Sequence, residues 1–241
     1  MKHIQKSLFG LSILSALAMS PTAAVAGPPL ICHAILIGQA KSLPWTSEGW
    51  NLSGNQSYDT ARLAEDTLNL LTPEMPVIVR METLRRATLY AQKDPMAAKR
   101  LLFELRARAL DSDAKGRPDA LAWFDYGYLV ECYKQTAWMP GKNGEGSNVS
   151  VLAANFDGYA AVEKAISLRG RADDEPQMEF AAALSGLEPP QPRQHEHAQR
   201  AVAAVSEGQD CLLAENLYKI PFLGKDNVAN ALMRTTVAAK N

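Results

Sequence analysis

The sequence has few of the residues and patterns that mark several classes of protein. Three cysteines among 241 residues are too few for a disulfide-stabilised miniprotein. Basic and acidic side chains number 25 and 26, so the basic excess typical of nucleic-acid-binding proteins is absent. After residue 26 no stretch holds 18 consecutive apolar residues, and we expect no membrane-embedded helix there. These absences are typical of a soluble globular protein.

Familiar signatures of catalysis and cofactor binding are also missing. No Gly-x-Ser-x-Gly motif is present to place a nucleophile on a sharp turn. The glycine-rich segment 141–147 lacks the order of a phosphate-binding loop, because Lys142 is followed by Asn143 and no strand precedes it. Cys32-His33 lacks the first cysteine of a haem attachment motif. The sequence therefore implies no cofactor and favours a non-enzymatic function, although an enzyme is not excluded.

Residues 1–26 have the three-part pattern of a secretory signal peptide. Lys2 and Lys6 precede an apolar run over 8–19, and Ala24-Val25-Ala26 supplies the small residues of a cleavage site. We predict cleavage before Gly27 and a periplasmic or secreted location. The alternative is an uncleaved N-terminal anchor helix.

Export bears on the cysteines, because an oxidising compartment permits disulfides. Three cysteines cannot all pair within one chain. Cys132 lies in a strongly helical, aromatic stretch and is predicted to be a buried thiol. Cys32 and Cys211 lie near the two ends of the mature chain, and we predict a disulfide between them.

The mature chain divides into an extended arm over 27–57 and a helical domain over 58–241. Within the arm, 30–37 is a short apolar run that suits a strand or a segment lying in a groove. Beyond residue 58 the apolar spacing becomes helical. We expect an all-α fold of stacked antiparallel hairpins, either a solenoid or an irregular bundle. The predicted helices cover 61–71, 77–92, 95–109, 119–137, 151–168, 176–185 and 195–206, followed by short apolar segments at 212–217 and 227–239.

Two motifs within 77–207 suggest a helical repeat. One is Trp123-Phe-Asp-Tyr-Gly127-Tyr-Leu-Val130, in which the glycine permits close helix approach. The other is Gly158-Tyr-Ala-Ala-Val-Glu-Lys-Ala-Ile166. They resemble the paired helices of a degenerate tetratricopeptide or Sel1-like repeat, and this resemblance implies a concave surface for a protein or peptide partner. The Pro-Pro-Leu-Ile-Cys-His opening also resembles secreted bacterial proteins of unknown function, which implies no activity.

Aromatic side chains concentrate between residues 123 and 133, where five occur. Aromatic side chains on successive faces of one helix cannot all point into one core. These rings therefore either bury the N-terminal arm or line a ligand groove. We take as candidate binding residues Trp123, Tyr126, Tyr128, Trp138 and Lys142.

Two further polar patterns occur in the sequence. His195 and His197 are weak candidates for a metal site, because i, i+2 spacing on a helix places side chains on nearly opposite sides. A polar helix start at the surface is the alternative, and the sequence therefore implies no metal. A solvated face interleaved with acids is predicted for the basic residues Arg80, Arg85, Arg86, Lys99, Arg100, Arg106 and Arg108. The alternative is that they attract an anionic partner.

The combined reading is an exported helical protein that binds a protein or peptide. The alternative is a secreted hydrolase or a small-ligand-binding protein, with a pocket at the aromatic helix and the glycine-rich loop. No nucleic-acid partner is expected, and the oligomeric state stays open.

Overall fold

A computed structural model describes residues 28–46, 52–139, 148–170, 175–186, 191–206 and 211–219. Within these ranges the regular elements are all helices, which confirms the all-α prediction. No helix in this part of the chain is long and apolar enough to cross a membrane. The predicted signal peptide, Lys142 and the segment 227–239 lie outside the described residues.

Ten α-helices follow one another in the described residues, with 3-10 turns at Thr60–Arg62, Thr136–Trp138 and Leu217–Lys219. The helices are α1 (Pro29–Cys32), α2 (Leu63–Leu70), α3 (Val77–Ala91), α4 (Pro95–Ala114), α5 (Ala120–Gln135), α6 (Asn148–Ala153), α7 (Gly158–Arg169), α8 (Glu175–Ser185), α9 (Gln194–Ser206) and α10 (Cys211–Asn216).

Aspartate caps begin the helices that matter most for the packing. Asp94 accepts hydrogen bonds from two backbone N–H groups at the start of α4, with Pro95 in the first helical position. Asp119 does the same for α5, and Asp157 accepts one such bond at the start of α7. These caps fix where each helix starts, and the start of α4 at Pro95 agrees with the predicted helix over 95–109.

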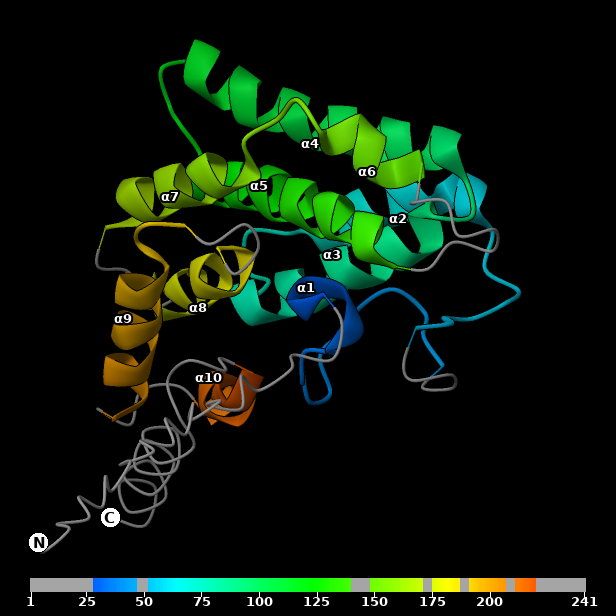
Figure 1. Cartoon of the computed structure of the whole chain (residues 1–241). Coiled ribbons are helices and arrows are strands. Elements are labelled where there is room, and N and C mark those ends of the chain that lie inside the picture. Colours follow the sequence, from blue (N-terminus) through cyan, green and yellow to red (C-terminus); the bar gives the residue numbers. More distant parts are fainter. Residues whose placement is uncertain are drawn as a thin grey trace, which may run out of the picture.

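Helix α5 lies at the centre of the molecule. Figure 1 shows α4 and α6 on one side of it, α7 beside it, and α3, α8, α1 and α10 on the other side. Direct contacts join α5 to α3, α4, α6, α7 and α8. The tightest crossing is between α5 and α7, where the Cα atoms of Gly127 and Gly158 face each other and a Cβ on Gly127 would lie 2.6 Å from the Gly158 carbonyl. The glycine of the predicted repeat motif therefore permits close helix approach.

Helix α3 is buried almost all round, and this corrects the prediction of a basic solvated face. Every residue of α3 except Arg86 is buried, with Arg80 exposed by 1% and Arg85 by 0%. A helix in the middle of a stack has no solvent side, so its charged residues are paired internally instead. On α4, by contrast, Lys99, Arg100 and Arg108 are exposed as predicted.

Three other sequence expectations need adjustment. The predicted helix over 151–168 is two helices, because Asp157 caps a new helix after a break at 154–157. The arm segment 30–37 begins with the single helical turn of α1 and is extended only afterwards. Helix α4 continues to Ala114, five residues past the predicted end at residue 109.

The cysteine predictions have mixed outcomes. Cys132 is fully buried, as expected, and carries a free thiol. Cys32 is a partly buried free thiol, and the side chain of Cys211 lies outside the described part of the chain. The structure therefore gives no support to the Cys32–Cys211 disulfide.

Candidate functional site

A cavity of about 590 Å³ opens at one end of the helix stack. It lies where α2 and α4 end, where α3 and α5 begin, and beside the last residue of α7. Its apolar wall consists of Leu71, Pro73, Leu121 and Ala122. The cavity size is in the range of small-molecule sites in proteins.

A buried ion pair lines the cavity on its inner side. Arg80 Nη1 donates to Asp125 Oδ2 at 2.6 Å, and the two side chains are 1% and 4% exposed. Arg80 Nε also donates to the Met75 carbonyl at 3.1 Å, and Nη2 donates to the Thr72 carbonyl. These three bonds fix the guanidinium group in one position. The second carboxylate oxygen, Asp125 Oδ1, is buried and has no hydrogen-bond partner in the structure.

Burial raises the pKa of Asp125 to about 6. Removing a carboxylate from water disfavours its charged form, and the positive charges of Arg80 and Arg108 offset only part of this effect. At neutral pH the group is mainly ionised and is a hydrogen-bond acceptor. An ionised, buried oxygen without a donor costs free energy.

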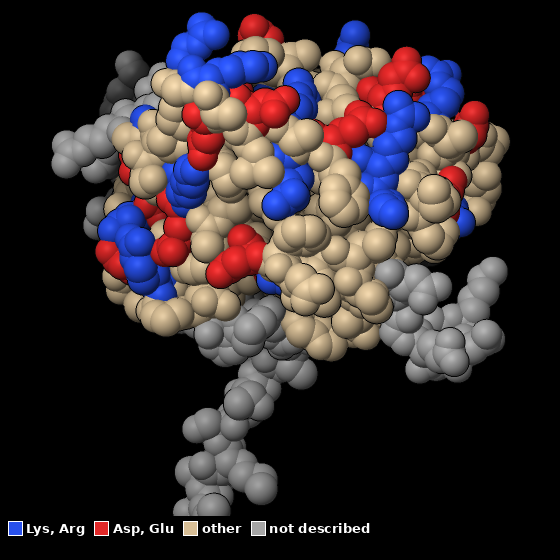
Figure 2. Space-filling view, turned by 90° about the horizontal axis from the view of Figure 1, so that it is seen from above, with Lys and Arg blue, Asp and Glu red and all other residues tan. Residues whose placement is uncertain are grey.

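The rim of the cavity is cationic. Arg108, Lys115, Arg117 and Arg169 are exposed and outnumber the two exposed acids, Asp111 and Asp119. Asp119 is already engaged with the backbone N–H groups of Leu121 and Ala122 as a helix cap. Figure 2 looks onto the side where α4 lies and shows Lys and Arg side chains interspersed with Asp and Glu. The exposed lining of the cavity has a positive excess.

The candidate aromatic residues are not gathered into one pocket. Tyr128 is fully buried and its ring stacks on Phe124 at 5.6 Å between centroids. Trp123 donates to Asp113 at 3.0 Å and lies 3.7 Å below the Lys164 ammonium.

Of the other two described candidates, Tyr126 lies beside Trp123 and Trp138 lies apart. The Tyr126 ring meets both Trp123 and Phe156 edge-on, each at 6.2 Å, and Trp138 is 46% exposed at the end of α5. None of the four aromatic candidates lines the cavity, which borders the same helix α5 nearer its start.

The N-terminal arm is held by a different set of rings and charges, those of α3. Tyr90 meets Trp45 edge-on at 5.5 Å and packs against Tyr58 at 4.3 Å. Glu82 Oε2 accepts from the Ile35 N–H at 2.9 Å, and Arg85 donates to the Ile31 carbonyl at 2.8 Å. Trp45 of the arm therefore packs against α3 and not against the aromatic stretch of α5.

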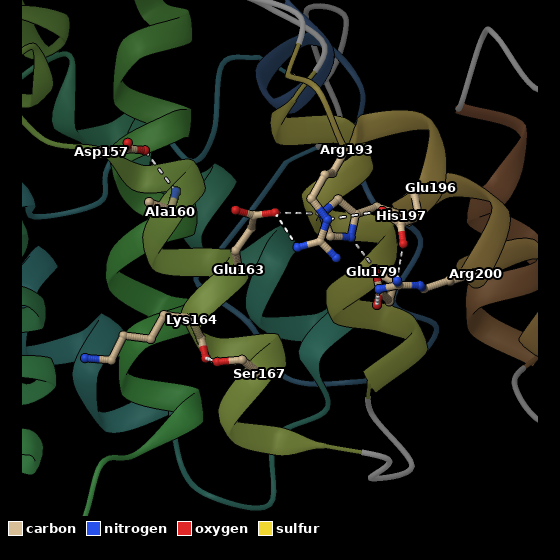
Figure 3. Close-up of polar contacts among 10 residues, drawn as sticks. All are labelled: Asp157, Ala160, Glu163, Lys164, Ser167, Glu179, Arg193, Glu196, His197 and Arg200. Carbon is tan, nitrogen blue, oxygen red and sulfur yellow. Dashed lines mark hydrogen bonds and ion pairs between the residues drawn. The ribbon is translucent and has the colours of Figure 1, made fainter.

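A second polar cluster joins α7, α8 and α9 (Figure 3). His197, 1% exposed, bonds Glu179 through Nδ1, and its Nε2 lies 3.4 Å from Glu163 Oε1. Arg200 donates to Glu179 at 3.0 Å, and Arg193 donates to Glu163 at 3.0 Å. This arrangement ties three helices together with paired charges.

The two histidines considered as metal ligands are separated. His197 is buried, whereas His195 is exposed on the same helix, as i, i+2 spacing on a helix requires. Among the described residues, no group of three or more His, Cys, Asp and Glu side chains is placed to hold a metal ion.

Sequence reasoning missed Asp125 and the interior role of Arg80. Asp125 is enclosed by aromatic residues in the sequence, and its partner is 45 positions away. An acid within an otherwise apolar helix was the available signal, because such a residue is buried only when it is paired.

Comparison with known proteins identifies no relative: no family model, no curated protein and no solved structure matches this chain.

Proposed function

We propose that this chain is an exported, non-enzymatic binding protein that holds a small anionic molecule in the cavity at the start of α5. The observation that carries the proposal is the cavity itself, of about 590 Å³, whose exposed rim cations Arg108, Lys115, Arg117 and Arg169 outnumber the exposed acids Asp111 and Asp119. A pocket of this size with a few convergent charged groups is typical of a small-molecule site. Export is inferred from residues 1–26 alone.

The geometry supports binding more than catalysis. Arg80 donates from Nε, Nη1 and Nη2 to three fixed acceptors of the protein. The pair therefore gives Asp125 no neighbouring nucleophile and no proton shuttle. An enzyme of acid–base type needs a second titratable group positioned beside the first. Binding requires only the complementary charge and hydrogen bonds that the cavity offers.

The proposal is tested by thermal shift and calorimetry with a panel of small carboxylates and phosphates. We expect at least one probe to raise the melting temperature of the full mature chain. The variant Lys115→Ser/Arg117→Ser removes two rim cations and should weaken binding at least about tenfold, because each charge-assisted contact contributes to affinity. The control Lys99→Ser removes an exposed cation of α4 that does not line the cavity, and should bind as the wild type does. Equal binding by both variants, or no binding of any probe, would contradict the proposal.

A second candidate is protein or peptide interaction, in line with the helical-repeat resemblance. One observation favours it: Met96, Phe103 and Leu110 recur every seven residues on α4 and are 74%, 45% and 40% exposed. Such spacing keeps side chains on one face of a helix. Replacement of Phe103 by Ser should abolish a partner interaction at this face and leave anion binding intact, as pull-down and calorimetry would show.

A further inference from the structure

Two of the rim cations are placed by a fixed turn at the end of α4. The Gly116 N–H donates to the Asp113 carbonyl at 2.8 Å, and the Arg117 N–H donates to the Ser112 carbonyl at 3.1 Å. Gly116 has a φ of 66°, so these two bonds form the Schellman motif in which many helices end. Because the motif fixes the backbone, Lys115 and Arg117 have defined places beside the cavity.

Three of the rim cations are available to a ligand. Within the part of the chain that the structure describes, the side chains of Arg108, Lys115 and Arg117 form no ion pair, hydrogen bond or ring contact. Other exposed cations are paired: Arg62 binds Asp66 and Arg100 binds Glu104, each four residues further along the chain. Unpaired cations around a cavity make its potential positive and attract anions into it.

The available cations occupy two separate places on the rim. Arg108 and Lys115 are seven residues apart, which puts them on one face of α4 and about 10 Å apart along the helix axis. Arg117 is two residues beyond Lys115. Asp111, which is exposed and also lines the cavity, lies between Arg108 and Lys115 along the helix. One anionic group midway between the cations would face this like charge, whereas two groups, one at each place, avoid it.

The inner wall of the cavity gives a ligand few hydrogen-bonding groups. Arg80 and Asp125 bind each other and are almost completely buried, and Asp125 Oδ1 is sealed from the solvent. Ser112 Oγ donates to the Ala109 carbonyl at 2.6 Å and accepts from the Asp119 N–H at 3.1 Å. Recognition therefore depends on the charged rim, and the part of the ligand between its anionic groups needs no hydroxyl or amino groups.

We propose, on the basis of the binding function proposed above, that the ligand is a small dianion with its two anionic groups at separate positions, in the simplest case a dicarboxylate. One group binds Arg108, and the other binds Lys115 and Arg117. The cavity of about 590 Å³ leaves room for a chain of several carbon atoms between the two groups. Both contacts are charge-assisted hydrogen bonds, which are stronger than bonds between neutral groups.

Isothermal titration calorimetry on the mature chain with matched probe pairs tests this. The pairs have equal numbers of carbon atoms: succinate with butyrate, glutarate with pentanoate, and adipate with hexanoate. Methyl phosphate represents a dianion with both charges on one group. We expect at least one dicarboxylate to bind at least about tenfold tighter than its monocarboxylate partner and than methyl phosphate, as an additional hydrogen bond between charged groups implies.

The two-point contact is tested with Arg108→Gln. This variant should bind the preferred dicarboxylate at least about tenfold more weakly and should hold it within about threefold of its monocarboxylate partner, because one of the two contacts is lost. Lys99→Gln is the matched control: Lys99 is exposed on the same helix and does not line the cavity, so the preference should persist. A preference that survives in Arg108→Gln would overturn the assignment.

Salt dependence is a readout that needs no variant and serves if Arg108→Gln fails to fold. Salt screens exposed charge contacts, and two contacts are weakened more than one. Between about 50 and about 200 mM sodium chloride, the affinity for the preferred dicarboxylate should fall more steeply than that for its monocarboxylate partner. Equal slopes would contradict binding at two places.

The failure of this inference differs from the failure of the proposed function. If monocarboxylates or methyl phosphate bind as tightly as every dicarboxylate, and binding still depends on Lys115 and Arg117, the ligand class is overturned and anion binding stands. If no probe binds in a manner that depends on these two cations, both proposals are overturned.

Discussion

The carboxyl group of Asp125 makes the stability of this protein depend on pH in an uncommon direction. Its pKa is about 6 in the folded chain and about 4 in an unfolded one. Between these values the folded state holds one more proton than the unfolded state. The free energy of unfolding therefore falls as the pH rises from about 4 to about 6. Most carboxylates act in the opposite sense, because pairing lowers their pKa.

We predict that Asp125→Asn removes this pH-dependent contribution. Relative to the variant, the wild type should lose on the order of 3 kcal/mol of stability between about pH 4 and pH 7, since one pKa unit corresponds to about 1.4 kcal/mol. Urea unfolding of both proteins at unit steps of pH measures the difference. The control Asp111→Asn, at an exposed rim position, should keep the wild-type profile. Parallel profiles for wild type and Asp125→Asn would show that the carboxyl group does not titrate in this window.

Single residues also show the limit of prediction from this sequence. Helix caps such as Asp94 can be predicted from the sequence, because the capping side chain bonds backbone groups two and three residues away. The burial of Arg80 is not, because it depends on a partner 45 residues away and on α3 having neighbours on every side. An arginine on a helix has the same local pattern whether the helix lies at the surface or in the middle of a stack.

At the level of helices, the crossing of α5 and α7 depends on two glycines. A Cβ on Gly127 would lie 2.6 Å from the Gly158 carbonyl and 2.8 Å from Ala161 Cβ. A Cβ on Gly158 would meet the Gly127 carbonyl at 2.5 Å. These distances are shorter than any real carbon contact, so the two helices can be this close only without the side chains.

We predict that Gly127→Ala destabilises the protein by about 1–3 kcal/mol, although alanine is the better helix former by about 1 kcal/mol. Overpacking must separate α5 from α7, which make the tightest crossing in the structure. The control Ala107→Gly, exposed on α4, should lose about 1 kcal/mol from helix propensity alone. Chemical unfolding of both variants measures the effect. A stabilised Gly127→Ala variant would contradict the close crossing.

A charged cluster around one buried histidine contributes to the attachment of helix α9 to α8 and α7. Glu163, Glu179 and Glu196 supply three carboxylates to the cluster, and Arg193 and Arg200 supply two fixed positive charges. His197 lies between Glu179 and Glu163 and bonds both helices (Figure 3). Without it Glu179 retains only Arg200 as a charged partner.

We predict that His197→Ala destabilises the protein by roughly 2–4 kcal/mol, because it leaves a buried carboxylate short of a partner and opens a void. Hydrogen exchange in α9 should accelerate more than in α3. His195→Ala, two residues earlier and exposed, should change stability by less than about 0.5 kcal/mol. Equal effects of the two substitutions would mean that the contacts of His197 do not hold α9.

The positions of most helices follow from apolar spacing and capping residues, whereas the break before α7 does not. The stretch 154–157 has no proline or glycine, and Asp157 becomes visible as a cap only when the chain is seen to turn there. The cavity could not be predicted from the sequence for a related reason. It is formed by the ends of α2, α3, α4, α5 and α7, and no single stretch of sequence contains it.

On the scale of the whole molecule, segments near the two ends of the described chain are joined by hydrogen bonds. The Leu36 N–H donates to Asn216 Oδ1 at 2.8 Å, and Asn216 Nδ2 donates to the Leu36 carbonyl at 2.9 Å. Asn216 is fully buried and also binds the Leu212 carbonyl within α10. The predicted Cys32–Cys211 disulfide would join these two segments. In the structure an amide side chain joins them, 180 residues away from its partner in the sequence.

The arm is attached to α3, to α10 and to α5, where the Leu30 N–H donates to Gln135 Oε1 at 2.8 Å. The attachment to α10 is the one that joins segments near the two ends of the described chain. We predict that Asn216→Ala destabilises the protein by about 1–3 kcal/mol, because the Leu36 N–H and carbonyl groups lose their partner in a partly buried position. Hydrogen exchange should rise over residues 36–38 and in α10, while the bonds of Glu82 and Arg85 keep residues 31–35 protected. Glu215→Gln, an exposed neighbour on the same helix, is the control and should leave both stability and exchange unchanged.

Asn216→Asp separates the two bonds: it keeps an acceptor for the Leu36 N–H and loses the donor to the carbonyl. Unchanged exchange over 36–38 in Asn216→Ala would show that α10 does not hold the arm, which would then be held by α3 and by the bond from the Leu30 N–H to Gln135 of α5.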